Sequence, residues 1–118
     1  MKEKCAILDC GGQYTKVIDR KVRELGVYTD IFPMGVRAEK LKDYGAIIFS
    51  GGTASVWEAG APTYDKEIFS LNIPMLGICY GMQLIVEHFG GVVAPEVKTE
   101  YGQIEIDVDP ACPLFAGL

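Results

Sequence analysis

The chain has 118 residues, 49% of them hydrophobic and 23% charged, as expected for one small soluble domain with a single core. Its formal net charge of -5 and sequence pI near 4.8 argue against a nucleic-acid binder, which would present a basic face. No apolar run approaches the roughly 18 residues of a membrane span, and from the first residues we expect no export signal. We therefore expect a cytoplasmic location, no membrane contact and reduced cysteines.

The four cysteines do not form a metal-binding pattern either. No C-x-x-C or C-x-H pair occurs among them, so we expect no metal site. One local exception to the acidic character is a stripe at helical spacing, formed by Lys16, Arg20 and Arg23. It indicates a solvated helix face, with a docking surface for an acidic partner as the alternative.

The first part of the chain alternates short apolar runs with amphipathic segments. In chain order the pattern predicts a strand at 5–10, a helix within 11–25, a strand at 27–32, a short helix at 38–44 and a strand at 45–50. The continuous apolar character of the strands is typical of strands buried on both faces of a sheet.

The second part continues the same alternation and then changes. The pattern predicts a helix at 61–71, a strand at 73–78, a helix at 80–89, a short strand at 90–96 and a half-exposed, antiparallel strand around 104–108. Buried strands alternating with helices indicate an α/β domain with a doubly wound, mostly parallel sheet.

Three glycine-rich turns follow the predicted buried strands. They read DCGGQYT at 9–15, FSGGTAS at 49–55 and LGICYGMQ at 76–83. Tight strand-to-helix turns need glycine for their own geometry, so each turn alone has a purely structural explanation. Together they lie at the carboxyl ends of the strands, where doubly wound sheets bind ligands.

The third turn carries a cysteine in a G-x-C-x-G pattern between a strand and a helix. This is the cysteine form of a nucleophile elbow, with Cys79 between Gly77 and Gly81. The turn pushes the central side chain above the sheet, and its flanking residues must be small because strand and helix crowd there. The helix N-terminus favours the thiolate, and the backbone N–H of Tyr80 points at a developing oxyanion. The alternative is an inert, buried thiol.

A second oxyanion donor is expected from the neighbouring turn. The SGGT segment at 50–53 follows a buried strand, and its Gly52 amide could approach Cys79. A phosphate cradle is the alternative, but the segment lacks the lysine of a P-loop and the chain has no G-x-G-x-x-G.

The sequence offers no base for such a nucleophile. His88 is the chain's single histidine, and it lies nine residues after Cys79. On one helix that spacing is about 13.5 Å of rise and about half a turn out of phase. His88 is therefore expected to be a structural residue near a helix C-terminus.

The motifs resemble those of the class I glutamine amidotransferases. GICYGMQ, the preceding SGG and the opening LD-GGQYT are most similar to the glutaminase part of GMP synthetases, and VRELGVY and EYGQIEI also match. The resemblance runs nearly end to end and implies a flavodoxin-like fold. Cys10 and Gly12 replace the usual Phe and Ser of the first turn, and Thr53 replaces a usual Pro.

The resemblance implies a role for each matching residue. Cys79 would attack the side-chain amide of glutamine, form a glutamyl thioester and release ammonia. Gly52 and Tyr80 would supply the oxyanion amides, while Gly51 and Gln83 would help hold the substrate glutamine. The ammonia would aminate XMP in an ATP-pyrophosphatase synthetase domain or subunit. ATP and Mg²⁺ are expected only in that partner, with no cofactor in this domain.

One family motif is missing from these 118 residues. The family's catalytic His and Glu belong to an H-P-E motif late in the domain, and no H-P-E occurs here. We therefore expect residues 1–118 to be an incomplete amidotransferase domain, truncated at the C-terminus, which lacks turnover by itself. An exposed sheet edge would follow, and with it self-association or binding of a partner chain.

Other functions remain open from the sequence. The DJ-1/PfpI-like proteins also place a cysteine at an elbow, although they usually have His where this chain has Tyr80. A non-catalytic glutamine-binding or regulatory module would explain the missing base. A flavodoxin-like nucleotide binder is the third alternative.

Overall fold

A computed structural model describes residues 3–11, 14–51, 64–92 and 111. The elements are strand β1 (Lys4–Asp9), helix α1 (Thr15–Glu24), strand β2 (Tyr28–Pro33), 3₁₀ helix η1 (Ala38–Lys40), strand β3 (Ala46–Phe49), 3₁₀ helix η2 (Lys66–Ser70), strand β4 (Met75–Gly77) and helix α2 (Tyr80–His88). The strands expected at 90–96 and 104–108 lie outside the described residues, apart from positions 90–92.

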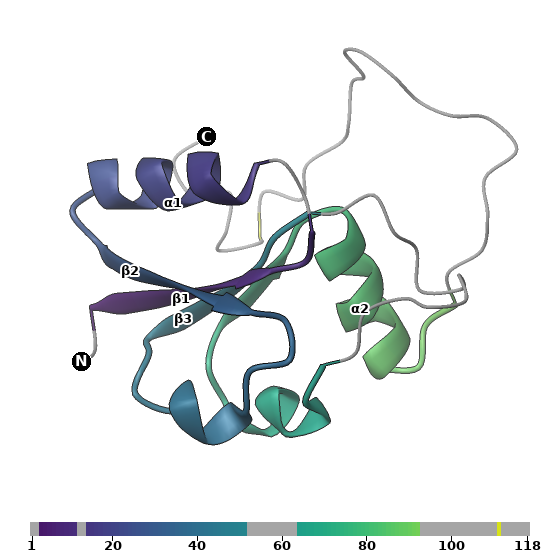
Figure 1. Cartoon of the computed structure of the whole chain (residues 1–118). Coiled ribbons are helices and arrows are strands. Elements are labelled where there is room, and N and C mark those ends of the chain that lie inside the picture. Colours follow the sequence, from purple (N-terminus) through teal and green to yellow (C-terminus); the bar gives the residue numbers. More distant parts are fainter. Residues whose placement is uncertain (1–2, 12–13, 52–63, 93–110, 112–118) are drawn as a thin grey trace, which may run out of the picture.

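The described strands form one parallel sheet in the order β2-β1-β3-β4. Ile7 in the middle of β1 pairs with Ile31 of β2 on one side and with Ile48 of β3 on the other. Figure 1 shows α1 above this sheet, and α2 with the two 3₁₀ helices below it. The prediction of a doubly wound α/β sheet is confirmed, and all described strands end at the same edge.

The main core lies between the sheet and the layer of η1, η2 and α2. Alternate residues of the central strands point into it, and all are fully buried: Ala6, Leu8, Ile47 and Phe49. Ile68 of η2 and Leu84 of α2 close this core from below. The rings of Phe49 and Phe69 stack with their centroids 5.5 Å apart. This packing fixes where α2, and therefore its first residue, meets the end of β3.

Helix α1 is attached to the other face of the sheet by a polar clamp. The Arg23 guanidinium donates to the Thr29 carbonyl oxygen over 2.7 Å and to the Asp19 carboxylate over 3.3 Å. The Thr29 hydroxyl also donates to Asp19, and this hydrogen bond is the main cause of the lowered pKa of Asp19. Arg23, part of the predicted basic stripe, thus joins α1 to β2. Arg20 pairs with Glu24 on the helix surface.

Three predicted elements differ from the structure, and one of them is the short helix expected at 38–44, which is a 3₁₀ helix over Ala38–Lys40 alone. Within the described residues, the helix expected at 61–71 is the 3₁₀ helix η2, which begins after Asp65, whose carboxylate caps it by accepting the Glu67 N–H. Asn72, with φ of 57°, ends that segment. The strand expected at 73–78 is shorter, and Leu76 remains 37% exposed.

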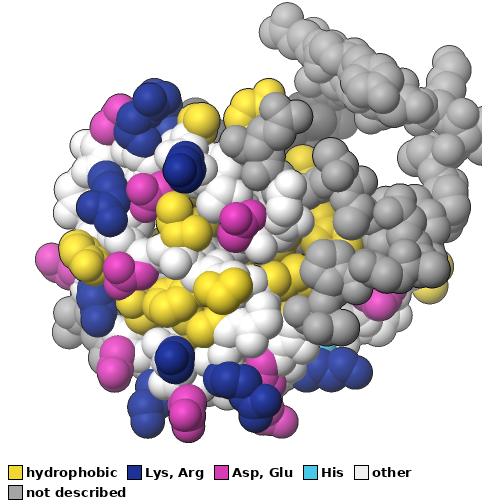
Figure 2. All heavy atoms as spheres, in the orientation of Figure 1, with side chains coloured by type: hydrophobic (Ala, Val, Ile, Leu, Met, Phe, Trp, Pro, Cys, Tyr) yellow, Lys and Arg dark blue, Asp and Glu magenta, His cyan; other side chains and the backbone are white. Residues whose placement is uncertain are grey.

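Strands β2 and β4 form the two edges of the described sheet. Figure 2 shows apolar side chains gathered over the β2 side of the molecule, with charged side chains around them. The exposed apolar residues of this strand include Tyr28 and Ile31. The expected self-association stays a prediction. Among the helices described, none is long and apolar enough to cross a bilayer.

Candidate functional site

Cys79 forms a sharp elbow between strand β4 and helix α2. It is the N-cap residue of α2, and its φ of 53° and ψ of -116° lie in a region that non-glycine residues seldom adopt. Its side chain is exposed. The predicted strand–cysteine–helix elbow is therefore present, and the buried-thiol alternative is wrong.

The two flanking glycines are required by the closeness of strand and helix. A Cβ atom on Gly77 would lie 2.6 Å from the Met82 backbone nitrogen. One on Gly81 would lie 2.5 Å from the Phe49 Cβ and would also overlap the Phe49 carbonyl oxygen. Real Cβ atoms do not approach other heavy atoms so closely, so both positions need glycine. The predicted crowding is confirmed.

Helix α2 begins directly at the thiol. The Gln83 N–H donates to the Cys79 carbonyl oxygen over 3.2 Å, and the Gly81 N–H donates to the Ile78 carbonyl oxygen over 3.0 Å. Gln83 lies in the first turn of α2 and is half-buried, while the Tyr80 side chain is 1% exposed and packs in the core. The positive end of the helix macrodipole therefore lies beside the sulfur.

The second glycine-rich turn reaches the Cys79 side chain. A Cβ atom on Gly51 would lie 3.1 Å from the Cys79 Cβ and 3.2 Å from its Sγ. The Ile78 N–H donates to the Phe49 carbonyl oxygen over 3.0 Å, which ties the end of β3 to the elbow. The structure thus brings Gly51 and Cys79 together, as the order of parallel strands predicts. Gly52 lies outside the described residues.

The first glycine-rich turn is joined to the second by a buried hydroxyl pair. The Ser50 hydroxyl donates to the Leu8 carbonyl oxygen over 2.9 Å and accepts the Cys10 N–H over 3.1 Å. It also lies 3.1 Å from the Thr15 hydroxyl, which contacts an Asp9 carboxylate oxygen at 3.2 Å. Neither Ser50 nor Thr15 was predicted to matter, although both lie inside the glycine-rich motifs of the sequence.

The other described cysteines lie in a different environment. Cys5 and Cys10 are both buried, and burial raises the pKa of each thiol. For Cys10 the neighbouring Asp9 carboxylate adds to burial, and the pKa rises to about 11. Such thiols are poor nucleophiles near neutral pH because little thiolate forms. Cys112 lies outside the described residues.

The His88 ring packs against other aromatic rings at the C-terminal end of α2. His88 is the last residue of that helix, and its ring stacks on Phe69 with the centroids 4.1 Å apart. The Phe89 ring packs edge-on against the His88 ring, with the centroids 5.0 Å apart. This aromatic packing supports the predicted structural role.

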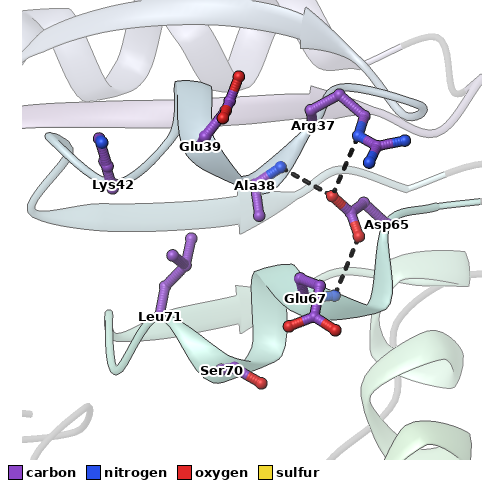
Figure 3. Close-up of a pocket in the computed structure, with 8 residues that line it drawn as sticks. All are labelled: Arg37, Ala38, Glu39, Lys42, Asp65, Glu67, Ser70 and Leu71. Carbon is purple, nitrogen blue, oxygen red and sulfur yellow. Dashed lines mark hydrogen bonds and ion pairs between the residues drawn. The ribbon is translucent and has the colours of Figure 1, made fainter.

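A separate hollow of about 520 Å³ lies between η1 and η2 (Figure 3). Asp65 lies on one wall of this hollow. Its carboxylate accepts the Ala38 N–H over 2.9 Å and pairs with Arg37 at 3.7 Å. No residue of the elbow lines this hollow. In the described part of the chain, no group of three or more His, Cys, Asp or Glu side chains could hold a metal ion.

Comparison with known proteins gives the family. The model of the glutamine amidotransferase class-I family matches residues 6–118. This chain belongs to that family. The amidotransferase chain is 48% identical over 120 residues to the GMP synthase [glutamine-hydrolyzing] of Carboxydothermus hydrogenoformans, covering 100% of the chain and 24% of that protein. It is 46% identical to the enzyme of the same name from Clostridium perfringens, with the same coverage.

A solved structure agrees with this assignment. The amidotransferase chain superposes with a TM-score of 0.74, at 34% identity, on a GMP synthase subunit from Thermoplasma acidophilum. The match covers 86% of this chain and 52% of that one. The chain therefore spans about a quarter of the length of the curated relatives and about half of this structural neighbour.

Proposed function

We propose that this chain is the glutaminase part of a GMP synthetase, with Cys79 as its nucleophile. One observation carries the proposal: in a chain of the amidotransferase family, the exposed Cys79 thiol lies at the N-terminus of α2 with Gly51 against it. The family match also favours this function over the DJ-1/PfpI-like and nucleotide-binding alternatives. The sequence similarity to GMP synthases supports the branch.

The proposed reaction begins with attack by the Cys79 thiolate on the side-chain amide carbon of glutamine. A sulfur–carbon bond forms, and the amide oxygen becomes an oxyanion that the backbone amides of Tyr80 and Gly52 stabilise. The oxyanion then collapses to the thioester carbonyl, the carbon–nitrogen bond breaks, and the leaving amide nitrogen takes up a proton and departs as ammonia. Water hydrolyses the thioester to glutamate. Gly51 and Gln83 hold the substrate beside the thiol.

The released ammonia would aminate XMP in an ATP-pyrophosphatase synthetase domain or subunit. ATP and Mg²⁺ belong to that partner in this proposal, and the glutaminase part uses no cofactor. We place the whole assembly in the cytoplasm.

The proton transfers need a base, and His88, the chain's single histidine, is not placed to act as one. The stacking of His88 on Phe69 keeps this histidine at the opposite end of α2 from the thiol. A helix terminus lowers a thiol pKa but cannot carry a proton to the leaving ammonia. We therefore propose that turnover requires the His-Pro-Glu segment of the family.

The test is ammonia release from glutamine by two proteins, the 118-residue chain and a version extended through a His-Pro-Glu segment. We expect turnover in the extended version and a rate lower by several powers of ten in the short chain. Cys79→Ala should abolish turnover in the extended version. Robust turnover by the short chain that depends on Cys79 would overturn the assignment of the missing base.

A non-catalytic glutamine-binding module is the second candidate, since His88 is held by aromatic packing. Titration calorimetry separates the two functions. Glutamine binding by the extended version without ammonia release would favour the module.

A further inference from the structure

The Ser50 hydroxyl lies at the centre of a buried hydrogen-bond network that joins two of the glycine-rich turns. Ser50 is fully buried, Thr15 is 5% exposed, and their hydroxyl oxygens lie 3.1 Å apart. The Ser50 hydroxyl is hydrogen-bonded to the Leu8 carbonyl oxygen and the Cys10 N–H at the end of β1. Its contact with Thr15 joins Ser50 to the start of α1. A hydroxyl with three polar neighbours in a buried network has very little rotational freedom.

The two hydroxyl groups are shared among more acceptors than they have protons. Two protons serve three oxygen–oxygen contacts: Ser50 to Leu8, Ser50 to Thr15, and Thr15 to Asp9. When Ser50 donates to Leu8, the Thr15 proton points either to Ser50 or to Asp9. The Asp9 carboxylate is held in place by the Gly11 N–H over 2.9 Å. The network is therefore a single unit, and loss of one hydroxyl changes both turns.

The backbone on both sides of Ser50 leads directly to the nucleophile. On one side, the Phe49 carbonyl oxygen accepts the Ile78 N–H, and the Ser50 N–H donates to the Leu8 carbonyl oxygen over 3.0 Å. On the other side, Gly51 lies against the Cys79 Cβ and Sγ. A rotation of the backbone at Ser50 would therefore move Gly51 relative to the thiol.

The geometry points to Ser50 as a positioning residue that fixes Gly51, at the end of β3, against Cys79, with Thr15 as its support from α1. This inference rests on the proposed function, in which the turn following β3 supplies an oxyanion donor. It does not make Ser50 a catalytic residue, because the hydroxyl points into the network and away from solvent. Its effect should therefore appear only in reactions that develop charge on a carbonyl oxygen at the site.

Two reagents separate positioning from simple thiol access. A chloromethyl ketone analogue of glutamine loses chloride as the sulfur–carbon bond forms, and its carbonyl oxygen gains negative charge beside the oxyanion amides. Methyl methanethiosulfonate forms a sulfur–sulfur bond and releases methanesulfinate, without any carbonyl. The ratio of the two rates at Cys79, followed by mass spectrometry of the 118-residue chain, reports on the turn and cancels changes in thiol exposure.

Four variants provide the comparison. Ser50→Ala should lower the rate ratio by roughly ten- to a hundredfold, the range expected for a misplaced oxyanion donor. Thr15→Val should lower it in the same direction while keeping the side-chain volume, and Thr15→Ser should restore it. Thr29→Val is the matched control, because it removes another fully buried hydroxyl at the opposite end of the sheet. Its ratio should stay within about twofold of the wild type.

Each outcome bears on one hypothesis. The rate ratio at Cys79 of the wild type is compared with the same ratio for free cysteine in solution. If the two ratios are equal, the proposed function fails, and this inference fails with it. If the wild type is selective and Ser50→Ala and Thr15→Val keep the ratio, the positioning role is wrong and the glutaminase proposal stands. An equal loss in Thr29→Val would also overturn it. Should Ser50→Ala fail to fold, the pair Thr15→Val and Thr15→Ser decides the matter.

Discussion

Two strand-to-helix turns of this molecule each contain one cysteine and two glycines, yet one cysteine is buried and the other is exposed. In the first turn Cys10 directly follows β1, its glycines come afterwards, and α1 starts only at Thr15. In the elbow, glycines lie on both sides of Cys79, and α2 starts at the next residue. Cys10 is buried against Leu8, whereas Cys79 is exposed. Among the described glycines of these two turns, only Gly77 and Gly81 of the elbow are crowded by strand and helix, whereas a Cβ on Gly11 of the first turn would meet nothing within 4 Å.

Substitution of an elbow glycine should give the largest effect. In Gly81→Ala the new Cβ would overlap backbone atoms of Phe49, which cannot rotate away. We expect the free energy of unfolding to fall by about 3 kcal/mol, the upper range for overpacking. Urea unfolding measures this loss. Gly35→Ala is the control, since a Cβ there meets nothing within 4 Å, and it should change stability by less than about 0.5 kcal/mol. Equal effects would contradict the crowded elbow.

Cys10 should react about a hundredfold more slowly than an ordinary exposed thiol, because a pKa of about 11 leaves it with little thiolate at neutral pH. Cys79 should be the first of the four cysteines to be alkylated. Limited iodoacetamide treatment with peptide mapping checks the order. Earlier labelling of Cys5, Cys10 or Cys112 would show that the elbow does not activate its cysteine.

The buried first turn should make the protein less stable in alkali. Burial, with help from Asp9, raises the pKa of Cys10 in the folded state to about 11, so the folded protein keeps a proton that the unfolded chain releases near pH 9. Stability from this thiol is present below pH 9 and is lost as the pH rises towards 11. The loss should reach about 2 kcal/mol. Unfolding curves of Cys10→Ala should show a shallower alkaline decline; an unchanged slope would refute this cause.

The smallest effect concerns the two ends of α2. His88→Ala removes the ring that stacks on Phe69, and the free energy of unfolding should fall by about 1 kcal/mol. Because His88 lies at the other end of the helix from Cys79, the rate of Cys79 alkylation should not change. A marked slowing of that alkylation in a folded variant would give His88 a role at the thiol.

The elbow could be predicted because its geometry depends on five adjacent residues, 77–81. Gly77, Cys79 and Gly81 create the crowding locally, and the apolar runs on both sides indicate a strand and a helix. The closeness of Gly51 to Cys79 also followed from the sequence, since the ends of neighbouring parallel strands meet at one edge of a sheet.

Features that depend on distant partners could not be predicted. The start of η2 is tied to a different segment by Asp65, whose carboxylate accepts N–H groups from Glu67 and from Ala38. The Ser50–Thr15 pair joins residues 35 positions apart, and small hydroxyl side chains produce no periodic pattern. Such hydrogen bonds exist only after the strands have been ordered in space, so no local pattern in the sequence reveals them.

The central position of β1 has a consequence for the order of assembly during synthesis. Of the described strands, β1 is synthesised before its central partner β3; Leu8 of β1 and Ser50, which directly follows β3, are 42 residues apart. At roughly 5–20 residues per second, that interval lasts a few seconds. During it, β2 is the one described strand already made with which β1 can pair, and the edge of β1 that will join β3 waits for its partner. The elbow between β4 and α2 is synthesised later still, and the Ile78 N–H binds the Phe49 carbonyl oxygen at the end of β3, so Cys79 takes its place after β3 has been made.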